Sequence, residues 1–581
     1  MTAHPRIVRR AEATAAQQLP AEWHAVTRRV LAGRGIATAA DLDITLAGLH
    51  EPRALGGLEQ AAALIEHVMG ADGRMLIVGD FDADGATSTA LAVRALRAMG
   101  ARDVCYLVPN RFEYGYGLTP EIVALAAQQT PSLIITVDNG VSSVEGVAAA
   151  QAAGIRVLVT DHHLPGAVLP AADAMVNPNL PGDGFPSKHL AGVGVIFYVM
   201  MALRARLRAQ GWFVARGIPE PRLADLLDLV ALGTVADVVA LDHNNRRLVA
   251  QGLLRIRAGQ CQPGVAALAD VAGRKRTRLS ASDLGYALGP RLNAAGRLAD
   301  MAVGIECLLT DDPARAAAIA EDLDRLNRER REIENDMREH AFALIEATLP
   351  RATPAELPAA FCLYHEAWHQ GVVGIVAARV KDRFHRPAIA FARAEDGSLK
   401  GSARSIAGVH IRDALDDVAT RNPGLITRFG GHAMAAGLTL EDGRLAAFEQ
   451  AFAAAVDRRL DAELKAKHLH SDGVLTSADF TVELAHELDT VSPWGQGFPE
   501  PRFDGPFTIE DCRVVGGRHA RLVLRADGDS ETSTVAAIAF GAATEPWCRK
   551  GARIHAVYKL GINDYGGLET VQLVIDYAVE R

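Results

Sequence analysis

The sequence predicts an α/β protein with a parallel-sheet domain, a long connecting helix, a second α/β domain and a β-rich C-terminal domain. Three observations support this prediction. Short apolar runs alternate with alanine-rich helical stretches between residues 71 and 240, a charged segment without Gly or Pro covers 314–347, and strand-like alternation dominates beyond about residue 470. Buried strands that alternate with helices are typical of a parallel sheet covered on both faces.

Length and composition agree with several domains. At about 150 residues per domain, 581 residues correspond to roughly four domains. Hydrophobic residues make up 49% of the chain and charged residues 23%, which excludes a largely disordered protein. We expect a helical region at 1–70, a parallel-sheet domain at 71–313, a connecting helix at 314–350, a second α/β domain at 351–465 and a β-rich domain at 466–581.

Neither a membrane span nor a secretion signal is predicted. The longest apolar run, residues 190–203, has about 14 residues, whereas a bilayer needs about 20. The N-terminus lacks an apolar signal core, so we expect a cytoplasmic protein.

Six cysteines without a CxxC pair predict reduced thiols, mostly buried, rather than disulfides or a zinc site. A net charge of −9 excludes an overall cationic protein but still permits a local basic groove for nucleic acid.

The individual elements follow from hydrophobic periodicity. Helical spacing predicts helices within 1–70 and at 222–260. The predicted parallel strands lie at 75–80, 104–109, 133–138, 157–161 and 174–178. High helix propensity at 314–347, ended by Pro350, predicts a rigid connector. Later runs predict a second α/β unit at 355–460 and then a small β-barrel or sandwich.

Acidic residues end three of the predicted strands, namely Asp80, Asp138 and Asp161. Because ligands bind outside the carboxyl ends of strands in an open parallel sheet, we expect these carboxylates to gather at one edge. The first strand continues as DFDADG, so Asp82 and Asp84 point the same way as Asp80 in an extended segment. Converging carboxylates repel each other, and a divalent cation such as Mg²⁺ or Mn²⁺ between them relieves the repulsion.

Two histidines and a further acid extend this set. His162 and His163 follow Asp161 directly, and imidazole among carboxylates shifts the preference toward Mn²⁺ or another transition metal. Asp237 closes the helical stretch that precedes it.

Alternative roles for the acidic run fit the residues less well. A single strand-end aspartate is most often a helix N-cap. An EF-hand loop needs Glu at its twelfth position, which is Leu91 when counted from Asp80, and a helix rather than a strand before it. A single-Mg²⁺ aspartyl phosphotransferase also begins with a strand and D-x-D-G, but it leaves Asp138 and the histidine pair without a role.

The motifs DFDADG (80–85), VDNG (137–140), DHH (161–163) and ADVVALD (236–242) resemble the four successive motifs of the DHH phosphoesterase superfamily. Almost the whole chain is similar to the single-strand-specific 5′→3′ exonucleases of bacterial DNA repair within that superfamily. The further similar segments are PNRFEYGYGL (109–118), LGPRLNAAGRL (288–298), GVVGIVAARV (371–380), GSARS (401–405) and FGGHAMAAG (429–437). The last three belong to the DHH-associated second domain, and the β-rich tail resembles the OB-fold of the family.

This resemblance implies a mechanism with two divalent ions, Mn²⁺ or Mg²⁺, that hydrolyses phosphodiester bonds and releases 5′-mononucleotides in DNA repair and recombination. The implied metal ligands are Asp80, Asp82, Asp84, Asp138, His162 and Asp237, with Asp138 between the two ions. His163 is implied to contact the phosphate, and Asp161 to orient the imidazoles.

Several residues are candidates for holding DNA. The basic run Arg274–Arg278 is equally compatible with a phosphate contact and with a solvated face. A contact with the DNA backbone is favoured for Arg291, Asn293 and Arg297, because these residues lie among Gly, Pro and Ala. Ser402 and Arg404 offer a hydroxyl and a guanidinium for a terminal phosphate. The resemblance implies that they recognise the 5′-phosphate together with Arg111, and that His432 also contacts phosphate.

Three functions are compatible with a protein that carries these motifs. An exonuclease on single-stranded DNA is favoured. A phosphoesterase of small nucleotides is an alternative, although such relatives generally lack the β-rich tail. A non-enzymatic scaffold should have lost metal ligands, and here every such position is filled. The resemblance also implies a helicase and a single-strand-binding protein as partners, and we expect a monomer that does not bind membranes.

Overall fold

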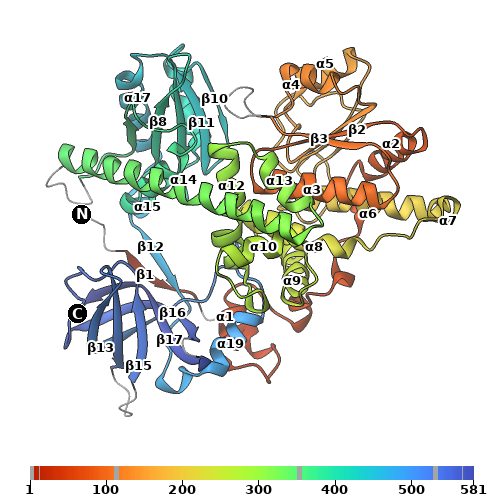
Figure 1. Ribbon diagram of the computed structural model, residues 1–581. Coiled ribbons are helices and arrows are strands. Elements are labelled where there is room, and N and C mark those ends of the chain that lie inside the picture. The colour runs from red at the N-terminus through yellow and green to blue at the C-terminus, as the bar shows by residue number, and fades with distance from the viewer. Residues whose placement is uncertain (1–4, 12–13, 110–116, 350–355, 528–533, 565–566) are drawn as a thin grey trace. The chain divides into compact units, whose positions relative to one another are not determined.

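The computed structural model describes residues 5–11, 14–109, 117–349, 356–527, 534–564 and 567–581 (Figure 1). The chain divides into two compact units. The larger unit comprises Arg10–Asn327 and Ser471–Arg581, and the smaller unit comprises Met1–Arg9 and Arg328–His470.

A five-stranded parallel sheet forms the centre of the larger unit, which confirms the predicted fold class. The strands are β2 (Met75–Gly79), β3 (Val104–Leu107), β4 (Leu133–Val137), β5 (Arg156–Thr160) and β6 (Ala174–Val176), in the order β3-β2-β4-β5-β6. Gly79 pairs with Val137, and Val137 pairs with Thr160. We call this register even, because the last residues of β2, β4 and β5 pair with one another. The three strands therefore end at the same level of the sheet.

Helices cover both faces of this sheet (Figure 1). Met75 and Ile77 of β2 join the main hydrophobic core, which contains side chains of α2, α3 and α6, whereas Leu76 and Val78 join a second core with α4 and α5. The helices of this region are α2 (Leu58–Gly70), α3 (Ala83–Ala98), α4 (Pro120–Ala127), α5 (Val144–Ala152), α6 (Gly192–Ala209), α7 (Trp212–Arg216), α8 (Leu227–Ala236), α9 (His243–Arg257), α10 (Pro263–Val271), α11 (Ala281–Asp283), α12 (Gly289–Leu298) and α13 (Ala302–Leu309). The continuous apolar runs of the strands reflect burial on both sides.

The N-terminal region differs in part from its prediction. Helix α1 (Ala25–Ala32) and α2 agree with the predicted helices, but β1 (Arg6–Arg9) is a strand that pairs with β12 (His468–Ser471). The partner strand lies more than 450 residues away in the sequence, so local periodicity could not indicate it.

Helix α14 (Pro313–Thr348) is the long connector that the sequence predicts. Ala316, Ala320 and Leu323 are buried in the core of the larger unit, and Ala341 and Ile345 are buried in a core of the smaller one. Short apolar faces at its two ends therefore anchor an otherwise charged helix.

The smaller unit contains a mixed sheet in the order β10-β11-β9-β8-β7. Only β7 and β8 are parallel within it. Its strands are β7 (Phe361–Tyr364), β8 (Ala388–Arg393), β9 (Leu399–Arg404), β10 (Arg428–Gly431) and β11 (Ala435–Leu440), and its helices are α15 (Val373–Phe384), α16 (Ile411–Arg421), α17 (Leu445–Asp457) and α18 (Ala462–Lys465). One core contains side chains of α14 and α15, and the other contains those of α16 and α17.

The C-terminal strands close into a barrel in the order β13-β14-β15-β17-β16, so the sandwich alternative is excluded. They are β13 (Phe503–Val515), β14 (His519–Ala526), β15 (Thr534–Ala539), β16 (Arg553–Asn563) and β17 (Thr570–Glu580), preceded by α19 (Val482–Thr490). Trp494, Phe498 and Phe503 are all buried. These aromatic side chains therefore pack the core.

A buried ion pair links the segment before the barrel to the N-terminal helices. Arg34 donates to both carboxylate oxygens of Asp472, at 2.8 and 2.9 Å, and its Nε donates to the carbonyl of Pro499. The two side chains are only 2% and 3% exposed, and the guanidinium lies over the ring of Trp494. Arg10 also lies 3.5 Å from the same carboxylate. Removing the charge of Asp472 therefore leaves a buried guanidinium without its anion.

The basic run Arg274–Arg278 also contacts the C-terminal region. Lys275 pairs with Asp564 at 2.6 Å, and Arg278 pairs with Glu569. Arg274 pairs with Asp283 at 3.1 Å. The side chains of this run remain about half-exposed or more, so these ion pairs exclude neither of the two interpretations that the sequence left open.

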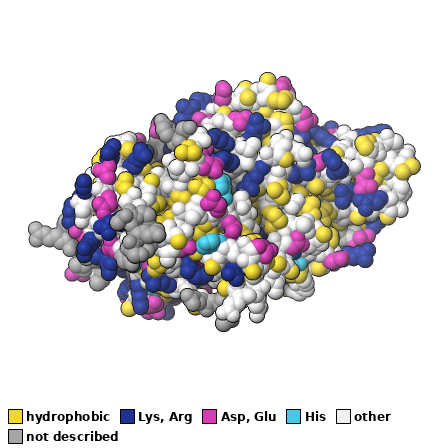
Figure 2. Space-filling model, turned by 90° about the horizontal axis from the view of Figure 1, so that it is seen from below, with side chains coloured by type: hydrophobic (Ala, Val, Ile, Leu, Met, Phe, Trp, Pro, Cys, Tyr) yellow, Lys and Arg dark blue, Asp and Glu magenta, His cyan; other side chains and the backbone are white. Residues whose placement is uncertain are grey.

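Charges of both signs are interspersed on the face shown in Figure 2, and no large field of a single sign covers it. Among the described residues, no helix is both long and apolar enough to cross a membrane.

We predict that Asp472→Asn lowers the free energy of unfolding by about 3–5 kcal/mol, because it leaves Arg34 charged and buried. Chemical denaturation followed by circular dichroism measures this loss. Asp103→Asn is the matched control, because Asp103 pairs with Arg74 at a half-exposed site and should change stability little. Equal effects of the two substitutions would contradict the structural role of the buried pair.

Candidate metal centre

Acidic side chains gather where the central strands of the larger unit end. Asp80, Asp138 and Asp161 directly follow β2, β4 and β5, and they are 7%, 1% and 1% exposed. The even register of the three strands thus brings together residues that lie up to 81 positions apart in the sequence.

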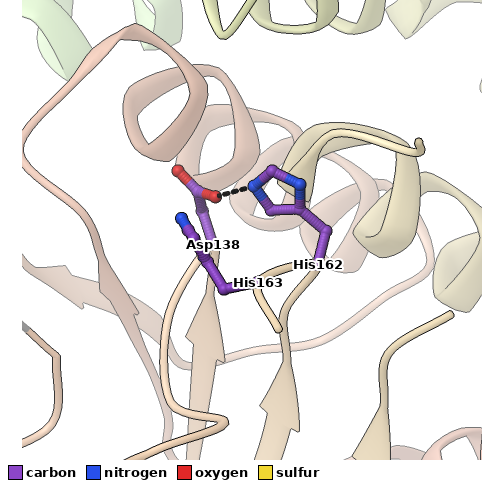
Figure 3. Close-up of side chains that lie close together, drawn as sticks. All are labelled: Asp138, His162 and His163. Atoms are coloured by element: carbon purple, nitrogen blue, oxygen red, sulfur yellow. Dashed lines mark ion pairs between the residues drawn. The ribbon is translucent and has the colours of Figure 1, made fainter. Parts of the chain in front are cut away.

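The side chains form three overlapping groups that could hold metal ions. In each group the ligand atoms lie within 4.8 Å of one another, and the groups are Asp80, Asp82 and Asp138; Asp84, His162 and Asp237; and Asp138, His162 and His163. The Nε2 atom of His162 lies 3.0 Å from Asp138 Oδ1 (Figure 3). The same atom lies 3.5 Å from Asp237 Oδ2. Asp138 and His162 each belong to two groups, so the geometry allows neighbouring ions that share a carboxylate.

The electrostatics of the cluster favour a bound cation. Burial, and then the neighbouring carboxylates of Asp84 and Asp82, raise the pKa of Asp138 well above its usual value. Burial and the same two neighbours also raise the pKa of Asp237. For Asp84, burial and Asp82 raise the pKa to about 7. The mixed set of carboxylates and imidazole suits Mn²⁺ or Mg²⁺, so the residues present fit the ions implied by the sequence.

The DFDADG segment is held by its own backbone and by α12. Asp82 caps α3, since its Oδ1 accepts hydrogen bonds from the N–H groups of Asp84 and Gly85. A Cβ atom at Gly85 would lie 2.4 Å from the carbonyl oxygen of Asp80, so only glycine fits there. Asn293 accepts a hydrogen bond from the N–H of Ala83 at 2.8 Å. The turn after β2 is therefore constrained from both sides.

The first turn of α6 holds Asp84. The N–H groups of Gly192 and Val193 donate to its two carboxylate oxygens, at 2.6 and 3.0 Å. A Cβ at position 192 would lie 2.6 Å from the Cβ of Asp138, which requires glycine at this close approach. Gly192 was not among the predicted site residues, although it lies in the run LAGVGV within the longest apolar segment.

Asp138 adopts an uncommon backbone conformation with φ 63°. The next residue, Asn139, is buried, and its side-chain amide donates to the carbonyl oxygens of Val78 and Val137. These bonds join the ends of β2 and β4 at the point where Asp80 and Asp138 leave the sheet. Left-handed backbone at a non-glycine residue costs energy, and here the surrounding bonds maintain it at the site.

The two histidines are positioned by Asp161 and two asparagines. Asp161 accepts from the N–H groups of His162 and His163 and lies 2.7 Å from the Nδ1 of His163. The side-chain amides of Asn177 and Asn179 donate to the backbone carbonyls of His163 and His162. Neither asparagine was among the predicted site residues, although Asn177 lies in a predicted strand.

Burial is the largest single influence and opposes charge on both members of the Asp161–His163 pair, but their mutual hydrogen bond and the attraction of nearby opposite charges together outweigh it. The pKa of Asp161 is lowered by this bond and by the nearby imidazoles, while the pKa of His163 is raised to about 8. Asp161 is thus an anion that holds the imidazole in a fixed orientation.

The other predicted DNA-binding residues fall in different places. In the larger unit, Arg291 is 7% exposed and pairs with Asp324 at 2.7 Å, and Arg297 is half-buried at the end of α12. In the smaller unit, Arg404 donates to the hydroxyl of Ser402 at 3.0 Å, and His432 is exposed just after β10. Arg111 lies outside the described residues.

Ser402 and Arg404 lie next to α15. A Cβ at Gly374 would lie 2.8 Å from the Ser402 hydroxyl and 2.9 Å from an Arg404 guanidinium nitrogen. The absence of a side chain at this position lets the hydroxyl and the guanidinium approach the helix backbone closely.

Three protein-family models match the chain. They are described as "DHH family, N-terminal domain" for residues 74–234, "DHHA1 domain" for 357–461 and "RecJ OB domain" for 471–577. The chain is also 55% identical over 565 residues to the single-stranded-DNA-specific exonuclease RecJ of Dickeya dadantii, covering 97% of each protein. The chain belongs to the RecJ family.

Solved structures of this family agree with the fold. The Mn²⁺ complex of RecJ from Thermus thermophilus matches with a TM-score of 0.81 and 30% identity, covering 99% of this chain and 79% of that chain. The Mg²⁺ complex from the same organism matches with a TM-score of 0.75 and 29% identity, covering 99% of this chain and 78% of that chain.

We predict that Mn²⁺ binds more tightly as the pH rises from about 6 to about 8, because the protonated carboxyl groups must lose protons before they can bind an ion. Asp84, whose pKa lies at about 7, titrates within this window. Isothermal titration calorimetry in two buffers of different ionisation enthalpy measures both the affinity and the proton release. In Asp84→Asn the pH dependence should shrink. A pH-independent affinity with no proton release would contradict the assignment.

Proposed function

We propose that this protein is a metal-dependent exodeoxyribonuclease that degrades single-stranded DNA from the 5′ end and releases 5′-mononucleotides in DNA repair and recombination, including mismatch repair. The main support is the buried cluster of carboxylates and imidazoles in a chain that is 55% identical to a single-stranded-DNA-specific exonuclease. Two divalent ions, Mn²⁺ or Mg²⁺, would supply an activated water and neutralise charge on the phosphoryl oxygens.

We assign the residues of the cluster to two metal sites and one phosphate contact. Asp80, Asp82 and Asp138 would hold one ion, and Asp84, His162 and Asp237 the other, with Asp138 shared between them. His163, kept in place by Asp161, would donate a hydrogen bond to a phosphate oxygen. The raised pKa of His163 supports this role, because a protonated imidazole is a donor at neutral pH.

A separate set of residues would select the DNA end. Ser402 and Arg404 offer a hydroxyl and a guanidinium side by side, which suits a phosphate monoester. We propose that they bind the terminal 5′-phosphate, and that His432 contacts a nearby phosphate. A pocket that accepts a monoester admits only a strand end, which accounts for exonucleolytic cleavage.

Helix α12 carries three further residues that were predicted to contact DNA, and two of them already bind other parts of the protein. Asn293 is already bonded to Ala83, and Arg291 to Asp324. The Asn293 bond supports a role in positioning the metal-binding turn, whereas the Arg291 pair connects α12 to α14. We propose that Arg297 and any remaining donors of these two residues contact the DNA backbone.

The setting of the reaction is inferred from the family. We propose a cytoplasmic monomer that acts on strands opened by a helicase and covered by single-strand-binding protein. A phosphoesterase of small nucleotides is the alternative, and the match of residues 471–577 to a RecJ OB domain speaks against it.

We predict that Asp138→Asn lowers kcat on 5′-phosphorylated single-stranded DNA by about 10²–10³-fold or more, because it removes a shared carboxylate from a preorganised site. Release of labelled mononucleotides with Mn²⁺ present measures the loss, and circular dichroism confirms that the variant is folded. Asp103→Asn, at a half-exposed carboxylate outside the cluster, should keep full activity. Wild-type turnover by Asp138→Asn would exclude the proposed centre, whereas cleavage of dinucleotides but not of long strands by the wild type would favour the alternative function.

For the end-binding residues, we predict that Arg404→Gln lowers kcat/KM by roughly 10–100-fold on a 5′-phosphorylated strand, which corresponds to the loss of one charged hydrogen bond of about 1.5–3 kcal/mol. On a strand with a 5′-hydroxyl the same change should have little effect. Arg393→Gln is the matched control, because Arg393 lies on the neighbouring strand and pairs with Asp442. An equal loss on both substrates would contradict recognition of the phosphate.

A further inference from the structure

The C-terminal barrel contains two cysteine side chains in direct contact. Cys512 lies on β13, and Cys548 lies in the segment between β15 and β16; their Sγ atoms are 3.3 Å apart. A disulfide bond is about 2.05 Å long, so the two sulfurs need to approach each other by only about 1.2 Å. This contact was not expected from the sequence, in which the two residues are 36 positions apart.

The backbone around both cysteines is well anchored. Ile509 of β13 donates to the carbonyl of Ala552, and the N–H of Gly551 donates back to Ile509. The N–H of Cys548 donates to Glu545. These bonds hold the two segments side by side, so the thiols meet because of the fold and not by chance collision of mobile loops.

Cys512 and Cys548 are both partly exposed, so a small reagent has better access to them than to a buried thiol. Cys307 provides a contrast, since it is buried and its Sγ bonds to the carbonyl oxygens of Gly264 and Ala316. Oxidation should therefore act on the barrel pair before it acts on the core thiol.

We propose that Cys512 and Cys548 form a reversible intramolecular disulfide when the protein meets hydrogen peroxide. The thiolate of Cys512 attacks one peroxide oxygen, which forms a sulfenic acid and releases hydroxide that takes up a proton as water. The sulfur of Cys548 then attacks the Cys512 sulfur, its thiol proton leaves with the displaced hydroxide as a second water, and the S–S bond forms. Two thiols are oxidised by two electrons in total, and one peroxide is reduced to two waters.

The order of attack follows from the environment of Cys548. Burial, and then the hydrogen bond with Cys512, raise the pKa of the Cys548 thiol to about 12. Cys548 therefore remains a protonated thiol and acts as the resolving residue, while Cys512 reacts first.

The bond would stabilise the barrel. It would close a loop that contains β14 and β15 and would restrict the unfolded chain. It would leave the metal centre unchanged, because neither cysteine belongs to the groups of described residues that could hold an ion.

The test uses the full-length protein, reduced and then exposed to hydrogen peroxide. Thiols counted after denaturation should fall from six to four, and peptide mass spectrometry should find residues 512 and 548 in one cross-linked peptide pair. Dithiothreitol should restore all six thiols. Cys512→Ser and Cys548→Ser should each abolish the cross-link, whereas Cys261→Ser, at a similarly half-buried site, should keep it.

Thermal unfolding gives a second, independent measurement. The oxidised wild type should unfold at a higher temperature than the reduced protein, and Cys512→Ser should show no such difference. Persistence of all six thiols under peroxide, a cross-link between other cysteines, or disulfides only between chains would each overturn the proposal. Because exonuclease activity is not part of the measurement, the result is independent of the proposed function.

Discussion

Repulsion among carboxylates at one edge of the parallel sheet is the constraint on which the rest of the site depends. Asp80, Asp138 and Asp161 are brought together by the even register of β2, β4 and β5, and Asp84 and Asp237 join them. Burial and mutual repulsion raise the pKa values of Asp84, Asp138 and Asp237. Divalent cations would neutralise this repulsion. The clustered carboxylates are unfavourable without a cation, and relief of their repulsion would therefore favour metal binding.

Such an arrangement needs a rigid support, and most of that support comes from backbone groups and amides. The first turn of α6 donates two N–H groups to Asp84, and Asn139 ties the ends of β2 and β4 together. Asn177 and Asn179 hold the backbone of the histidine pair. Neutral amides suit this task, because they fix position without adding charge to a site whose chemistry depends on charge.

The role of a basic residue in this protein depends on the acidic residue with which it pairs. A run such as Arg274–Arg278 has the composition of a nucleic-acid contact, yet its members pair with acids such as Asp564 and Glu569. The buried pair of Arg34 and Asp472 likewise joins distant segments. In this protein many Arg and Lys side chains form ion pairs that hold segments together.

The sequence alone determined the α/β class, the positions of the five parallel strands to within one or two residues, and the acids and histidines that gather at the edge of that sheet. These features have local signals: continuous apolar runs mark buried strands, and an aspartate that ends a strand marks the edge of a sheet. The closed barrel, by contrast, depended on pairing between distant strands, and so did the pairing of β1 with β12. The supporting roles of Gly192 and Asn179, the pairing of Arg291 with Asp324 and the contact between Cys512 and Cys548 were likewise decided only by the tertiary structure. Their chemistry depends on which residue lies opposite in space, and no local pattern of the chain carries that information.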